Sequence, residues 1–190
     1  MKKVKYVGFD ISTSIIGVCF LDSEYNLIDL DNIDLKKSKD IFDKSIVVSN
    51  RIVYYKKNYN FDDECVISIE EPFQSFSRGF SSAKTISQLN RFNGIVSYII
   101  HKNFSIKPLY INVNKARKFL QIKLDKKSNI STKEQVFSWV KQQIPDFNWP
   151  TKKLKSGPNK GVVKFHESCY DMSDAFVICK ALNLYEEDNK

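Results

Sequence analysis

The first 30 residues contain three successive apolar runs, and each run is typical of a β-strand. They span Val4 to Asp10, Ile15 to Asp22 and about Tyr25 to Leu30, with only short turns between them. Strands joined by tight turns pair in antiparallel order, so the chain is expected to begin as a three-stranded meander. The first strand ends on a carboxylate, Asp10, which is delivered into a Ser/Thr-rich turn.

Helices and strands alternate in the rest of the chain. Apolar residues recur at helical spacing over Lys39 to Tyr59 and again from Ala83, with a β-branched run between them at Cys65 to Glu70. A fifth strand is expected over Ile106 to Val113, and a basic loop or small hairpin over about 146–168. The other segments are helical: Lys115 to Ile122, Thr132 to Ile144, and a final, almost wholly apolar element from about Asp171 to Tyr185.

This order predicts an α/β fold in one domain over residues 1–190. Its sheet has five strands and is mixed, with three antiparallel N-terminal strands and two further strands, and helices flank it. The formal net charge is +8 and the pI is near 9.2. A basic excess of this size favours a polyanionic partner, either nucleic acid or an anionic membrane surface.

Several classes of site are disfavoured by the sequence. No run approaches the roughly 20 apolar residues of a membrane span. The N-terminus lacks the apolar core of a secretion signal, so a cytoplasmic protein is expected. The chain has two histidines, and its cysteines form no C-x-x-C pair, which argues against structural zinc and disulfides. They are Cys19, Cys65, Cys169 and Cys179.

Four acids recur at the ends of predicted elements, although each has a structural explanation of its own. Asp10 could bond the backbone of its turn. Glu70 ends an apolar strand in the sheet centre, where an unpaired carboxylate is costly, while its neighbour Glu71 points to the other face. Asp171 and Asp174 lie at i and i+3 on one helix face, where they could equally serve as an N-cap and a dipole partner.

An Asp, a Glu and an Asp-x-x-Asp pair that all end or begin predicted elements would occur together by chance far less often than any one of them alone. Converging carboxylates bind hard divalent cations such as Mg²⁺. In a two-metal site, one ion generates the attacking hydroxide and the other stabilises the leaving oxygen. The sequence therefore predicts metal-dependent phosphodiester hydrolysis, with Asp10 as the bridging ligand.

Three blocks of the sequence resemble the signatures of RuvC-type Holliday-junction resolvases, members of the ribonuclease-H-like superfamily. They are GFDISTSIIGV, ISIEEPF and YDMSDAFVICKAL, and LNRFNGI and KEQVFSWV also match in order and spacing. The resemblance implies a ribonuclease-H-like fold with Asp10, Glu70, Asp171 and Asp174 as catalytic metal ligands. It also implies two Mg²⁺ ions, replaceable by Mn²⁺, and a homodimer that nicks four-way DNA junctions in symmetric pairs, without a nucleotide cofactor.

Further residues are expected to bind DNA. By resemblance, Phe73 enters the junction centre, and Lys133, Arg117 and Lys118 lie near the scissile phosphate. The basic residues Arg78, Lys152, Lys153 and Lys155 are expected to contact the DNA as well. Two departures from the bacterial pattern suit a bacteriophage or divergent member: the first turn reads DISTSIIG without a Pro-Gly pair, and the lysine-rich stretch has no counterpart.

Three other functions share parts of this pattern. An actin-like or sugar-kinase-type ATPase is disfavoured, because it needs a second domain and a second glycine-rich loop, whereas this chain has six glycines. Another ribonuclease-H-like nuclease, acting on branched or flapped DNA generally, fits the same acids. A non-enzymatic DNA-binding module would use the acids only structurally, and would be indifferent to Asp174→Asn.

Overall fold

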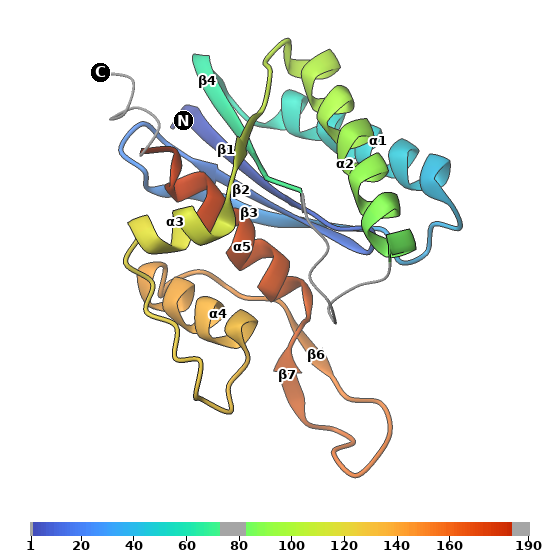
Figure 1. The fold of residues 1–190 in the computed structure, drawn as a ribbon, viewed down its shortest axis with the longest axis vertical. Helices are drawn as coiled ribbons and strands as arrows, with labels where there is room; N and C mark the ends of the chain where they lie inside the picture. The colour runs from blue at the N-terminus through green and yellow to red at the C-terminus, as the bar shows by residue number, and fades with distance from the viewer. Residues whose placement is uncertain (1, 73–82, 184–190) are drawn as a thin grey trace.

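The computed structural model describes residues 2–72 and 83–183. Its main sheet has five strands in the order β3-β2-β1-β4-β5 (Figure 1). The antiparallel meander consists of β1 (Val4–Ile11), β2 (Ile15–Leu21) and β3 (Leu27–Asp34). Two strands, β4 (Phe61–Glu70) and β5 (Leu109–Ile111), then run parallel to β1. The predicted mixed α/β sheet is confirmed.

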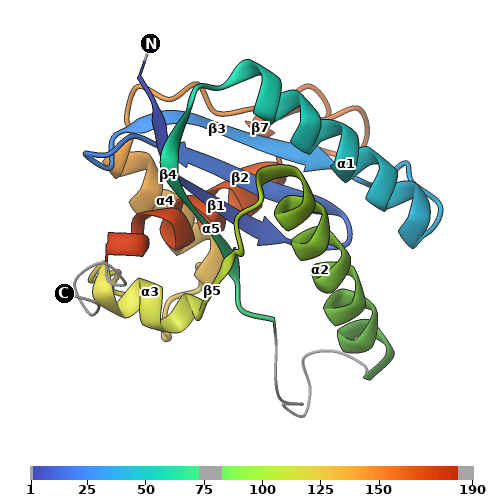
Figure 2. The same cartoon turned by 90° about the horizontal axis from the view of Figure 1, so that it is seen from above.

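Helices cover both faces of the sheet, as Figure 2 shows. One face carries α1 (Ile41–Asn58) and α2 (Ala83–Phe104), which pack on apolar side chains such as Val7, Phe9 and Ile67. The other face carries α5 (Ser168–Lys180), with α3 (Val113–Phe119) and α4 (Thr132–Gln143) beside it. Because the sheet is covered on both faces, its central strands read as continuous apolar runs.

Several element boundaries differ from the predictions for identifiable reasons. The fifth strand is only three residues long, since Pro108 offers no amide proton before it and Asn112 caps α3 after it. The fourth strand begins earlier, at Phe61, which pairs with Val4 across a register shift. The capping box of α4, formed by Ser131 and Glu134, agrees with the predicted N-terminus. None of the described helices is long and apolar enough to cross a membrane.

The last helix lies unusually close to the sheet because two glycines face it. A Cβ atom on Gly17 would lie 2.0 Å from the carbonyl oxygen of Asp171, and one on Gly8 would lie 2.5 Å from that of Ala175. Any larger residue at either position would displace the backbone of α5. The helix is buried along most of its length, as its apolar sequence predicted.

The basic stretch before α5 forms a two-stranded antiparallel hairpin, which was one of the two predicted forms. Its strands are β6 (Thr151–Lys153) and β7 (Val163–Phe165). A turn with Gly157 and Gly161 at positive φ connects them. The hairpin forms a sheet of its own and leads directly into α5.

Candidate active site

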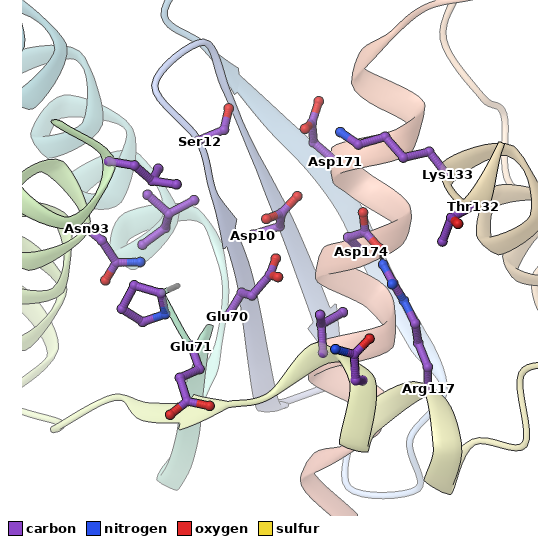
Figure 3. Close-up of a pocket in the computed structure, with 15 residues that line it drawn as sticks. Asp10, Ser12, Glu70, Glu71, Asn93, Arg117, Thr132, Lys133, Asp171 and Asp174 are labelled. Atoms are coloured by element: carbon purple, nitrogen blue, oxygen red, sulfur yellow. Dashed lines mark hydrogen bonds and ion pairs between the residues drawn. The ribbon is translucent and has the colours of Figure 1, made fainter. Parts of the chain in front are cut away.

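A cavity of about 490 Å³ opens where β1 and β4 end and α5 begins. Its walls come from six elements and adjoining loop residues, so residues far apart in the sequence meet there (Figure 3). All four predicted acids line it, as do two of the predicted basic residues: Asp10, Glu70, Asp171, Asp174, Arg117 and Lys133. The structure therefore brings together the residues that the sequence singled out.

Strand geometry aims the first two acids into this cavity. Asp10 pairs with Gly17 across the β1–β2 ladder, so its side chain lies on the face that α5 covers. Glu70 ends the neighbouring strand and lines the same cavity, where its negative charge acts on Asp10. Figure 3 shows the Glu71 carboxylate pointing away from this pair. It accepts a hydrogen bond of 3.2 Å from the Asn112 amide instead.

The other two acids lie one turn apart on α5, and one of them already has a cationic partner. The Asp174 carboxylate accepts a 2.8 Å hydrogen bond from Nη2 of Arg117, a residue of α3. Both side chains are nearly buried, with 8% and 14% exposed. Asp171 is the fourth residue of α5 and not its N-cap, because the helix begins earlier, at Ser168.

The four carboxylates lie in a strongly anionic setting. Burial raises the pKa of Asp10 well above its usual value, and the negative charges of Glu70 and Asp174 raise it further. Burial also raises the pKa of Glu70, although its interaction with Asp10 acts in the opposite direction. Burial raises the pKa of Asp171 to about 6, against the attraction of the Lys133 ammonium. Burial is the largest cause of each shift and the negative charge of Asp174 adds to each, and a bound cation would offset both effects.

This donor set fits a divalent metal ion. The carboxylates supply only oxygen atoms, which Mg²⁺ and Mn²⁺ prefer. Burial and the neighbouring negative charges all raise the pKa of Asp10, and a bound cation would counteract them. Within residues 2–72 and 83–183, no three or more His, Cys, Asp or Glu side chains lie close enough together to coordinate a metal ion. The side chains would therefore have to move inward to bind one, and Asp174 would have to share its carboxylate with Arg117.

The predicted DNA-binding residues fall into three groups. Arg117 and Lys133 line the cavity, whereas Lys118 is exposed and lies outside it. The exposed hairpin carries Lys152, Lys153 and, just after β6, Lys155. Phe73 and Arg78 lie outside the described residues. Contact with DNA stays a prediction for every one of them.

Sequence reasoning did not find three features of this site. Ser12 closes the turn after β1, accepting from the Ile15 amide at 3.0 Å and donating to its carbonyl oxygen at 2.6 Å. Asn93 of α2 lines the opposite wall, with only 4% of its surface exposed. The third feature is the contact of Gly17 with α5. A glycine placed directly opposite an acid in a predicted hairpin could have signalled that contact.

Three solved structures with a similar fold are of RuvC and of a Holliday junction resolvase. Neither a protein-family model nor a curated protein matches the sequence. A structure of Thermus thermophilus RuvC with a Holliday junction substrate superimposes with a TM-score of 0.61 at 12% identity, covering 96% of this chain and 94% of that one. The chain has the RuvC fold. A second structure of Thermus thermophilus RuvC shares this fold with a TM-score of 0.57 at 12% identity, over 97% of this chain and 96% of that one.

The RuvC fold also relates this chain to a eukaryotic organelle protein. The yeast mitochondrial Holliday junction resolvase superimposes with a TM-score of 0.57 at 16% identity, over 99% of this chain and 83% of that chain. At such identities the likeness concerns the fold, and the predicted ribonuclease-H-like architecture is confirmed by it. The activity of this chain has to be argued from its own residues.

Proposed function

We propose that this protein is a divalent-metal-dependent endonuclease that resolves four-way DNA junctions. The observation that carries the proposal is the convergence of Asp10, Glu70, Asp171 and Asp174 from three separate elements on one cavity. Retaining four mutually repelling acids in a largely buried site has a cost in folding free energy. A role in metal binding accounts for that cost, whereas a purely structural role does not.

In this proposal the chain holds the metal and the DNA with different residues. The four carboxylates hold one or two Mg²⁺ ions, which when bound supply the attacking hydroxide and stabilise the leaving 3′ oxygen. Lys133 and Arg117 line the cavity from two helices, and in this proposal they bind the scissile phosphate. Because the 3′ oxygen is the leaving group, cleavage leaves a 5′ phosphate and a 3′ hydroxyl.

Paired cleavage further implies a homodimer. A four-way junction is close to two-fold symmetric and needs two nicks, whereas the described part of each chain carries one such acid cluster. Two copies related by a two-fold axis would present two sites to one junction. Light scattering of the free protein and of its junction complex tests this, and a protein that is monomeric in both would overturn it.

The activity itself is tested with a labelled synthetic four-way junction, a linear duplex and a flap, each incubated with Mg²⁺ or with EDTA. Paired symmetric nicks in the junction alone, lost in EDTA and in Asp10→Asn, are the expected result. Equal cutting of the junction and the flap would instead indicate a general branched-DNA nuclease. Tight binding without cutting, unaffected by Asp174→Asn, would indicate the non-enzymatic binding module.

A further inference from the structure

The hairpin of β6 and β7 is a local concentration of positive charge. Residues 151–166 contain five lysines and no Asp or Glu, while the formal net charge of the whole chain is +8. All six strand residues are exposed, and Figure 1 shows the hairpin projecting from the body of the protein. Two-stranded hairpins are marginally stable in water, so like charges gathered on one need an explanation.

The strand register sorts these lysines onto two faces. Lys152 pairs directly with Lys164, whereas Lys153 pairs with Val163. Successive residues of a strand point to opposite faces, so Lys152 and Lys164 share one face. Like charges directly opposite each other destabilise strand pairing. An anion bound between Lys152 and Lys164 would reverse that effect.

The second face of the hairpin is already occupied by the protein itself. Phe165 lies on it with Lys153, because Phe165 pairs with Thr151. The Phe165 ring packs edge-on against Phe137 of α4, with 5.0 Å between the centroids, and the ammonium of Lys141 lies 4.5 Å from its centroid. This face is therefore turned toward α4, and the face of Lys152 and Lys164 is turned away from it.

The outward face has more positive charge than its neighbours neutralise. Glu167, just before α5, forms an ion pair with Lys36 and also lies 3.7 Å from the Lys152 ammonium. One carboxylate is thus shared by two lysines. In the described part of the chain Lys164 has no ion-pair partner. The cluster of Lys36, Lys152, Lys164 and Glu167 therefore keeps a surplus of two positive charges.

The position of the hairpin relative to the cavity suggests what this surplus binds. The hairpin leads into α5, whose first turn holds Asp171 beside the end of β1. It projects away from the sheet on the side that carries α4 and α5 (Figure 1). We propose that the face formed by Lys152 and Lys164 binds the phosphate backbone of a duplex arm of the DNA, away from the point of cleavage. The inference rests on the proposed function and adds a second, distinct contact surface to it.

Two charge-matched double variants test this assignment. Lys152→Ala with Lys164→Ala removes two charges from the outward face, and Lys57→Ala with Lys102→Ala removes two from the exposed last turns of α1 and α2, which hold none of the predicted DNA-binding residues. Junction binding is measured by fluorescence anisotropy in EDTA over a range of salt concentrations. The first variant should bind about tenfold more weakly, and the slope of log K against log salt should fall by about 1.8, because two phosphate contacts are lost. The second should change little.

Further arms of the experiment separate the possible outcomes. Lys152→Arg with Lys164→Arg should retain binding, and thermal unfolding should show that all three variants are folded. The loss should be large with long-armed junctions and small with arms too short to reach the hairpin. Equal losses in the two alanine variants, or losses independent of arm length, would overturn the assignment but leave the nuclease proposal standing. A wild-type protein that binds no branched DNA would overturn both.

Discussion

Replacing Asp171 by Asn should stabilise the metal-free protein and abolish cleavage. The folded-state pKa of Asp171 is about 6, against an ordinary value of 3.8. Below pH 3.8 the carboxyl is protonated in the folded and the unfolded protein, so burial costs little. As the pH rises through 6, the folded protein must ionise a half-buried acid, and the stability contributed by the protonated form is lost. Asn never ionises and avoids this cost.

The magnitude follows from the shift of about 2 pH units. At about 1.4 kcal/mol per unit it corresponds to about 3 kcal/mol above pH 7. Solvent screening of a half-buried group reduces this to about 1 to 2 kcal/mol. For a chain of 190 residues the melting temperature should then rise by about 5 °C at pH 8, and hardly at all at pH 4.

The assay is thermal unfolding by circular dichroism in EDTA, at pH 8 and at pH 4, with Asp22→Asn as the control. Burial raises the pKa of Asp22, but the hydrogen bonds from Lys2 and Asn26 outweigh it, so the pKa lies below its usual value. Asp22→Asn should therefore lower the melting temperature at pH 8. If Asp171→Asn were no more stable than the wild type at pH 8, or if its gain were the same at pH 4, the reasoning would be refuted.

Three further predictions concern the walls of the cavity. Arg117→Gln should tighten Mn²⁺ binding to the free protein about tenfold in calorimetry, because the cation that now pairs with a carboxylate of the site is removed; unchanged affinity would contradict this. Gly17→Ala should cost about 3 kcal/mol of unfolding free energy and slow cleavage, whereas Gly94→Ala, with nothing within 4 Å of its added methyl group, should be neutral or stabilising. Lys133→Ala should slow junction cleavage about a hundredfold with little change in melting temperature, while Lys118→Ala, outside the cavity, should retain most of the rate; equal losses would disprove the distinction.

Much of the fold could be predicted from the sequence because its strands are short-range patterns. The apolar runs and tight turns of the first three strands identify the meander. The alternation of β-strand side chains indicated that only one of Glu70 and Glu71 faces the site, and Glu70 was favoured because Glu71 precedes Pro72, where the chain leaves the sheet. The structure places these residues accordingly. Their catalytic role stays a prediction, since position alone does not demonstrate chemistry.

The features that were missed depend on contacts between distant residues. Arg117 and Asp174 are 57 positions apart, and no local pattern reveals that they form an ion pair. The two faces of the basic hairpin became visible only once its register was known, since a shift by one residue would exchange Lys152 and Lys153. The length of β5 was overestimated because apolar character continues past the cap at Asn112.

The direct contact between α5 and the backbone of the sheet has an evolutionary consequence. Where a helix rests on side chains, each substitution in the core can shift it, and a site that spans both layers shifts with it. Here the separation is fixed by main-chain atoms at Gly8 and Gly17. Volume-conserving substitutions in the surrounding core should then leave the spacing of the acids unchanged.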